Sequence, residues 1–227
     1  MKLKDLISIL RYGELTNISW DNEVRIPQVI AQINLGLLNL YSKFPILEKS
    51  IAIAQYPHIS IYNLTSQYAR TNTESTETYK YILDTQLDPF KDDILQITAA
   101  TDEFGISIPL NDDNAPNSWF LPAYNQLQIP NAALDETAFL IYRAKPEYID
   151  PETKDLDIEV FMPQYLVDPL VNYVAYKIFI SMGGENAQIA SIYQQLYEKQ
   201  CMDIANSNLL NNNNSVTNIK PLIGGYV

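Results

Sequence analysis

The chain has 227 residues, of which 47% are hydrophobic and 19% charged, a composition typical of a folded protein with a sizeable core. Fifteen Lys and Arg against 27 Asp and Glu give a net charge of −12, which argues against a protein that grips nucleic acid through its phosphates. A single cysteine excludes an intrachain disulfide and a cysteine-based zinc site.

Residues 1–46 are predicted to be helical. Apolar residues recur at spacings of three and four along residues 23–44, which places them on one face of a long helix. Pro27 suits the first turn of this helix, and Pro45 ends it. A short amphipathic helix over residues 3–11 should pack beside it. That helix mixes lysines with leucines, so it lacks the continuous apolar core of a signal peptide. No run reaches the roughly 18 apolar residues of a membrane span, so a soluble protein is expected.

Residues 47–162 are predicted to be rich in short strands, because the apolar period changes there from 3.6 to two. Loop-forming residues separate the strands, and the polar run 71–78 is expected to be an exposed loop. Short strands at this spacing predict an antiparallel sandwich or curled sheet. The strand candidates are residues 51–53, 58–62, 79–83, 94–100, 105–110, 118–121, 126–129, 138–143 and 157–161.

Helical periodicity returns over residues 163–207. Leu166, Leu170 and Val174 begin a stripe that repeats every four residues, so a helix is expected here. Pro169 leaves two alternatives open: the helix starts there with Asp168 as its cap, or a kink occurs at that point. Gly183-Gly184 then separates it from a second helix, so the pair is predicted to be an antiparallel αα-hairpin.

Residues 208–227 are predicted to form an extended C-terminal arm. Seven of the thirteen residues from Asn206 to Asn218 are Asn, too polar to form a core of their own. The arm ends in apolar residues, which suit binding to a partner: Leu222, Ile223, Tyr226 and Val227. The predicted fold is therefore α+β: N-terminal helices and a C-terminal hairpin enclose an inserted antiparallel β-sandwich-like region, followed by the arm.

The sequence offers no catalytic constellation, so we expect neither an enzyme nor a bound cofactor or metal. His58 is the only histidine and Cys201 the only cysteine, and neither has a second histidine as a partner. Glycine-rich phosphate loops are missing. The pairs Asp92-Asp93, Asp102-Glu103 and Asp112-Asp113 fall at predicted turns, where solvated loop charges are expected. Asp155, Asp157 and Glu159 share one face of a predicted strand, either its solvated side or an acidic strip facing a partner.

Sixteen tyrosines are the notable surplus in this composition. Tyr is common at the centres of protein interfaces, and the predicted hairpin carries more tyrosines than one core stripe can bury. Subunit contact and packing at the edge of the core are both open for each of them. The five interface candidates are Tyr165, Tyr173, Tyr176, Tyr193 and Tyr197.

Several short strings, taken in their order along the chain, resemble the head-to-tail adaptor family (tail tubular protein A-like) of tailed, especially short-tailed, bacteriophages. The first two are LRYGELTN at residues 10–17 and INLGLLNLYSKFP at residues 33–45. The others are DDILQI at 92–97, IPLND at 108–112, NQLQIP at 125–130, YRAKP at 142–146 and YVAYK at 173–177. The resemblance covers most of residues 10–205 and carries no catalytic signature.

This resemblance implies a structural protein of the virion neck. About twelve copies would form a ring between the portal protein and the tail tube or nozzle, and genomic DNA would pass through without specific binding. Helices would build the ring wall, the β region would meet tail components, and the C-terminal arm would bind the portal. An acidic channel would suit DNA passage. A completion or stopper protein, or a host-range accessory on the neck, belongs to the same class.

A different class remains open: the β region could be a carbohydrate-binding or depolymerising module. That hypothesis predicts a concave groove lined by Trp119, Phe120 or Tyr124, with two facing carboxylates.

Overall fold

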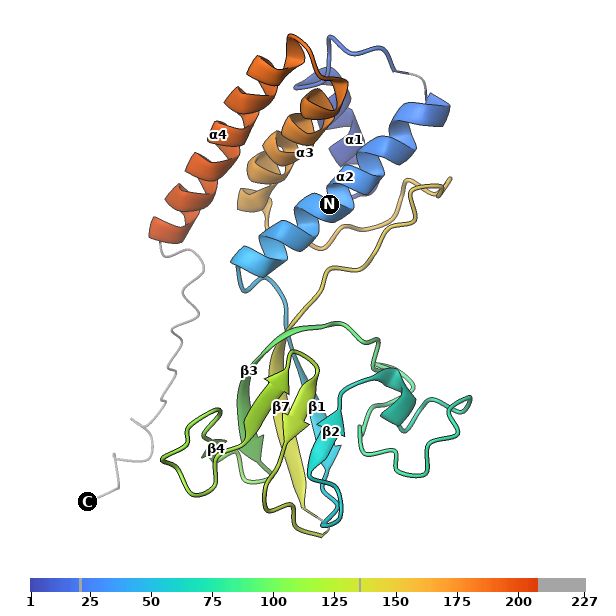
Figure 1. Cartoon of the computed structure of the whole chain (residues 1–227). Coiled ribbons are helices and arrows are strands. Elements are labelled where there is room, and N and C mark those ends of the chain that lie inside the picture. Colours follow the sequence, from blue (N-terminus) through green and yellow to red (C-terminus); the bar gives the residue numbers. More distant parts are fainter. Residues whose placement is uncertain (21, 135, 208–227) are drawn as a thin grey trace, which may run out of the picture. The chain divides into compact units, whose positions relative to one another are not determined.

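A computed structural model describes residues 1–20, 22–134 and 136–207, and the chain divides into two compact units. Among the described residues, the helical unit consists of residues 1–40 together with residues 148–207. The β unit consists of residues 41–147. The described residues form four α-helices and two antiparallel sheets, so the predicted α+β class is confirmed (Figure 1). The predicted changes of structure at residues 46 and 162 lie further along the chain than these unit boundaries.

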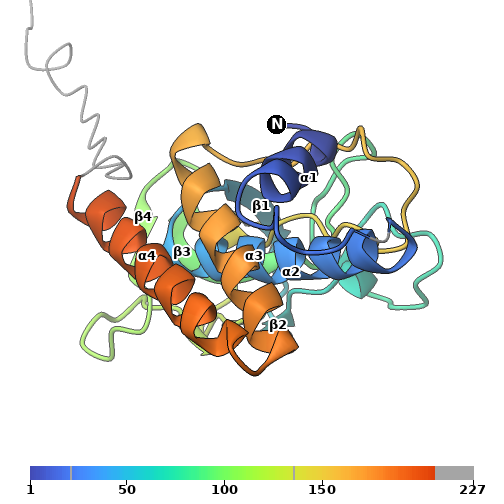
Figure 2. The ribbon, with the colours of Figure 1, turned by 90° about the horizontal axis from the view of Figure 1, so that it is seen from above.

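The helical unit contains α1 (Leu3–Tyr12), most of α2 (Asn22–Lys43), α3 (Val167–Met182) and α4 (Asn186–Asn206). All four helices agree with the predicted ones to within a few residues. α3 and α4 lie side by side as an antiparallel hairpin, and α3 lies between α4 and α2 (Figures 1 and 2). The reversal uses Gly183 and Gly184, whose φ angles of 65° and 58° are those that glycine adopts most readily. Among the described residues, no helix is both long and apolar enough to span a membrane.

Pro169 lies in the first turn of α3, where its missing N–H costs no helical hydrogen bond. The helix follows a 3-10 turn at Gln164–Leu166, and Leu166 occupies the N-cap position. The prediction of Asp168 as the cap is therefore wrong. Asp168 instead lies inside the first turn, near the positive end of the helix dipole.

Gly36 allows α2 to approach α3 closely. A Cβ at this position would lie 2.5 Å from Leu170 Cδ1 and 2.9 Å from Tyr173 Cδ1, closer than side chains can pack. The other inward positions of the helical unit are large and aliphatic, and the most buried include Leu3, Leu6, Leu10, Leu15, Ile30, Ile33, Leu37, Leu40, Leu166, Leu170 and Ile178. Many of these residues recur at spacings of three and four, as the sequence pattern predicted.

The β unit holds a four-stranded and a three-stranded sheet, both antiparallel. The first has the order β1-β7-β3-β4, formed by Glu48–Ala54, Thr137–Ala144, Ile94–Asp102 and Ser107–Ile108. The second has the order β2-β6-β5, formed by Ile61–Asn63, Gln126–Gln128 and Phe120–Ala123. Side chains of both sheets meet in one hydrophobic cluster, which includes Ile53 and Leu140 from the first sheet and Tyr62 and Leu127 from the second.

Two predicted strands are wrong. Residues 79–83 make only isolated bridges at Ile82, to Ile53 and Ala69. Tyr81 and Ile82 are both buried in the cluster, so the alternation on which this prediction rested is absent there. Residues 157–161 make one bridge, between Glu159 and Lys2, because their backbone partner is the start of the chain. The other seven predicted strands each overlap an observed strand, although residues 58–60 precede β2 and several observed strands are shorter than expected.

Polar side chains hold the irregular parts of the β unit. Asp84 accepts hydrogen bonds from Thr71 N (2.9 Å), Thr71 Oγ1 and Phe90 N (3.0 Å). Arg143 Nη2 donates to the carbonyl oxygens of Tyr41, Ser42 (3.2 Å) and Phe44 (2.6 Å), where α2 ends. Carbonyls at a helix end have no helical partner, so the guanidinium supplies one.

Candidate functional site

The β unit contains a hollow of about 310 Å³ whose wall is mostly polar. We call it the Trp119 hollow. The side chains that matter chemically come from five separate places in the chain: Gln55, Asp102, Asn117 with Trp119, Asn131, and Glu136.

Strand register brings three of these residues together. Ala54 on β1 is opposite Thr137 on β7, and Asp102 on β3 is opposite Ala138. Gln55, Asp102 and Glu136 therefore lie at the same edge of the β1-β7-β3 sheet. Gln55 N donates a hydrogen bond of 2.9 Å to the backbone oxygen of Glu136, and this bond holds the two backbone segments side by side.

Two hydrogen-bond donors in the wall remain unpaired within the described residues. Gln55 Oε1 accepts from Ala133 N at 3.2 Å, while the amide NH2 of Gln55 has no hydrogen-bond partner there. The indole N–H of Trp119 has none either. Both side chains are only 7% exposed. Arg143 Nε is the one side-chain atom of the described residues that is both sealed from solvent and unpaired, so the other two donors still reach solvent.

Asp102 and Glu136 supply the acceptors. Asp102 Oδ1 accepts hydrogen bonds from Phe104 N (2.9 Å) and Ile106 N (2.8 Å), which form the turn after β3. Its second oxygen has no partner among the described residues, and neither has the exposed carboxylate of Glu136. The groove predicted for a carbohydrate-binding module thus has a partial counterpart: Trp119 lines the hollow, but Phe120 and Tyr124 do not.

The predicted lack of a catalytic constellation remains a prediction, and the structure places the residues on which it rests. His58 is exposed, and its ring lies 4.6 Å from the ring of Tyr79 and 5.9 Å from that of Tyr56, centroid to centroid. Cys201 is buried on α4, in the other unit. Across residues 1–20, 22–134 and 136–207, no three His, Cys, Asp or Glu side chains are grouped to hold a metal ion.

Among the acidic pairs, Asp93 has a role that the sequence did not reveal. Its carboxylate bonds to Lys49 Nζ at 2.6 Å and accepts from the Tyr142 hydroxyl at 2.9 Å. Burial and the neighbouring Asp93 raise the pKa of Tyr142 above its ordinary value. Asp92 and Asp112 instead accept backbone N–H groups in loops, as expected of turn residues.

A second candidate surface is an apolar stripe on the exposed side of α4. Ile189, Ile192 and Leu196 are spaced by three and four residues and are 40%, 58% and 41% exposed. We call them the α4 stripe. The buried side of the same helix carries Ala190, Tyr197, Cys201 and Ile204, so the stripe is not the face that packs in this unit. Contiguous exposed apolar residues often mark a contact with another protein.

Two of the five interface candidates are buried within the unit. Tyr173 and Tyr197 pack edge to face with ring centroids 5.3 Å apart, and Tyr197 Oη donates to Asn39 Oδ1 at 2.5 Å. They therefore offer little surface to a second copy. Tyr165 is partly exposed, and Tyr176 packs against Tyr173.

Tyr193, the last interface candidate, lies beside the α4 stripe. It stacks on Phe179, and its hydroxyl donates to Glu14 Oε2 at 2.5 Å. Burial and the contact with Glu14 raise the pKa of Tyr193. The predicted arm residues Leu222, Ile223, Tyr226 and Val227 lie outside the described residues.

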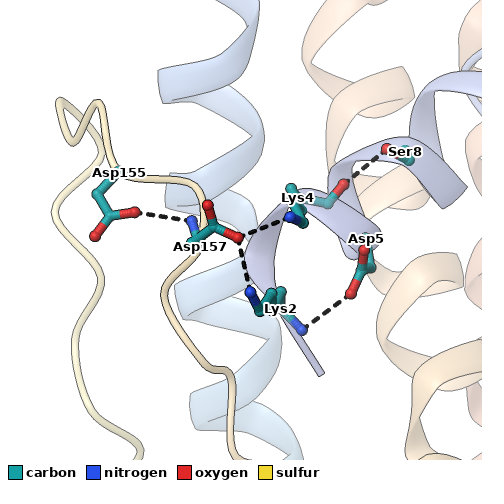
Figure 3. Close-up of polar contacts among 6 residues, drawn as sticks. All are labelled: Lys2, Lys4, Asp5, Ser8, Asp155 and Asp157. Atoms are coloured by element: carbon teal, nitrogen blue, oxygen red, sulfur yellow. Dashed lines mark hydrogen bonds and ion pairs between the residues drawn. The ribbon is translucent and has the colours of Figure 1, made fainter.

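The start of the chain is tied to residues 156–160 (Figure 3). Leu3 N donates to Ile158 O and Lys4 N to Leu156 O, both at 2.9 Å. The carboxylate of Asp157 pairs with Lys2 Nζ at 2.9 Å and Lys4 Nζ at 2.7 Å. Hydrogen bonds and charge from Lys4 and Lys2 lower the pKa of Asp157 to about 2. Asp157 thus pairs with lysines of its own chain, a partnership not predicted from the sequence.

Comparison of the chain with protein-family models and with curated proteins found no match.

Proposed function

We propose that this protein is a head-to-tail adaptor of a tailed bacteriophage: a structural subunit that forms a ring between the portal protein and the tail tube or nozzle. The ring encloses a channel for genomic DNA, and the subunit catalyses no reaction.

The observation that supports this proposal best is the way the chain divides. Among the described residues, 1–40 and 148–207 form one helical unit, and the β unit is inserted between them in the sequence. The resemblance implies this order of helices, β insertion and helical hairpin. In this proposal the helical unit builds the ring wall and the β unit meets tail components.

The α4 stripe is the proposed contact between neighbouring copies. In a ring, one face of each subunit meets a different face of the next. α2 also exposes apolar side chains, Leu35 at 49% and Leu38 at 40%, so the unit offers apolar residues on two helices that flank α3. The net charge of −12 suits a channel wall that DNA passes without adsorbing, because like charges repel.

Native mass spectrometry and negative-stain imaging of the purified chain mixed with portal protein test the ring. We expect a closed ring with a central hole. Ile192→Glu combined with Leu196→Glu should abolish it, because burying two carboxylates in an apolar contact is costly. Gln195→Glu, on the polar side of the same helix, is the matched control and should still form rings. Ring formation by the double variant would refute the α4 contact, and a monomer that ignores the portal would refute the adaptor.

A second experiment addresses the arm. Deletion of residues 208–227 should leave the circular dichroism spectrum and melting temperature unchanged while abolishing attachment to the portal. Replacing Leu222 and Ile223 by Ser within the full-length chain should have the same effect on attachment. Normal attachment by both variants would contradict the proposed role of the arm.

A further inference from the structure

The Trp119 hollow has a chemistry for which a ring subunit has no evident use. Two of its lining residues, Gln55 and Trp119, carry N–H donors that are unpaired among the described residues, and each residue is 7% exposed. Both donors still reach solvent, so water can accept from them when the hollow holds no ligand. A ligand that brings hydrogen-bond acceptors can replace this water and keep both donors paired.

The acceptors in the wall restrict the charge of such a ligand. Asp102 and Glu136 line the hollow, and the remaining lining side chains include no Lys, Arg or His. An anion such as a phosphate or a carboxylate would meet two negative charges and no positive one, so it is disfavoured. A neutral molecule that both donates and accepts can satisfy the carboxylates and the two N–H groups together. Hydroxyl groups do this, because each carries one donor and two acceptor lone pairs.

The size of the hollow and the apolar part of its wall narrow the class of ligand further. A volume of about 310 Å³ lies at the small end of ligand pockets. Ile108, Pro116 and Pro130 contribute apolar surface beside the amides of Asn117 and Asn131. A pyranose ring likewise combines polar and apolar surface, with hydroxyls around its edge and C–H groups on its faces.

We propose that the Trp119 hollow binds one neutral sugar residue. The indole N–H of Trp119 and the amide of Gln55 donate to sugar oxygens, and the carboxylates of Asp102 and Glu136 accept from sugar hydroxyls. The proposal concerns binding and includes no cleavage. It is independent of the adaptor proposal, because it rests only on side chains of the β unit.

The two tryptophans make a direct test possible, because Trp20 belongs to the helical unit and Trp119 to the β unit. In a 1H–15N spectrum of the full chain, Trp20→Phe and Trp119→Phe assign the two indole N–H signals. The probes are glucose, galactose, mannose and N-acetylglucosamine, each added to about 50 mM. For a ligand this small, a dissociation constant on the order of millimolar is expected. The Trp119 signal should shift saturably with at least one sugar, and the Trp20 signal should stay in place.

Glu136→Gln tests the wall, because this exposed carboxylate has no side-chain partner in the described residues and its loss should not affect folding. It should weaken binding of the responding sugar at least about fivefold, since it replaces a charged acceptor by a neutral one. Glu103→Gln is the matched control, because Glu103 is exposed next to Asp102 but does not line the hollow, and its affinity should equal that of the parent.

Three results would overturn the proposal. The first is an unmoved Trp119 signal with all four sugars. The second is an equal response to inorganic phosphate or glucuronate, which would show that charge does not matter in the hollow. The third is an unchanged affinity of Glu136→Gln for the responding sugar.

Discussion

The two units of this chain are stabilised by different means. In the helical unit, aliphatic side chains at helical spacing fill the interior, and one glycine sets the distance between α2 and α3. In the β unit, short strands leave long stretches of backbone outside the two sheets, and charged side chains such as Asp84 and Arg143 hold parts of those stretches. A unit held by packing should respond to changes of volume, and a unit held by charged hydrogen bonds should respond to pH and to loss of a single polar group.

The tryptophans allow each unit to be followed separately. Urea unfolding of a Trp20→Phe background reports the β unit through Trp119, and a Trp119→Phe background reports the helical unit through Trp20. The following predictions use these two backgrounds, in order of decreasing effect.

Arg143→Met should destabilise the β unit most, by about 2–3 kcal/mol, because carbonyls at the end of α2 lose their charged donor. The midpoint of urea unfolding, read from Trp119 fluorescence, measures the loss. Arg143→Lys keeps the positive charge but can reach fewer carbonyl oxygens, so the stability of this variant should lie between that of Arg143→Met and that of the parent. A Met variant as stable as the parent would mean that solvent replaces the guanidinium without cost.

Gly36→Ala should destabilise the helical unit by about 1–2 kcal/mol. In an exposed helix this change normally stabilises by about 0.5–1 kcal/mol, so the opposite sign would come from overlap with Leu170 and Tyr173. Trp20 fluorescence during urea unfolding gives the value. Gln32→Ala, which also introduces alanine into α2, is the control and should be close to neutral. A stabilised Gly36→Ala variant would show that the two helices can separate freely.

Asp84→Asn should cost the β unit about 1 kcal/mol at neutral pH. Partial burial alone would raise the pKa of Asp84, but hydrogen bonds from Thr71 and Phe90 outweigh it and lower that pKa. A lowered folded pKa means that the contribution is complete above the unfolded value near 3.8 and disappears as pH falls through the folded value. The parent should therefore lose stability towards acid more steeply than the Asn variant. Parallel pH profiles would contradict this assignment.

Asp157→Asn should have the smallest effect, because its ion pairs with Lys2 and Lys4 are exposed. Its lowered pKa, about 2, gives stability that is present above the unfolded pKa of 3.8 and lost as pH falls towards 2. The difference in stability between parent and variant, measured by Trp20 fluorescence during urea unfolding, should shrink further in 1 M NaCl. The screening length there is about 3 Å. A difference that persists in high salt would point to the backbone hydrogen bonds around residue 157 instead.

The contrast between the helical unit and the β unit also explains which parts of the fold the sequence could predict. Regular apolar spacing located all four helices, because in a helix the period directly reports the buried face. Strand prediction was less complete. Tyr81 and Ile82 are consecutive and both buried, so residues 79–83 do not follow the period of a half-exposed strand.

The two candidate sites also differ in how far the sequence could predict them. Spacing placed the residues of the α4 stripe on one apolar side together with Tyr197 and Ile204, and only the structure separates the exposed stripe from the buried face. The Trp119 hollow could be predicted only as a possible groove near Trp119. Its wall combines Gln55, Asp102 and Glu136, whose proximity depends on strand register, and no local pattern encodes register over such separations.

The split of the helical unit between the two ends of the chain has a consequence for folding. During synthesis, α1 and most of α2 emerge first, but the helices that cover them follow only after residues 41–147 have been made. Holding the two ends together across an unfolded insertion would cost loop-closure entropy, whereas a folded β unit shortens the effective loop. The β unit should therefore form early, because its folding brings the two parts of the helical unit within reach of each other. Until then the apolar face of α2 stays uncovered, and uncovered apolar surface of this kind favours aggregation.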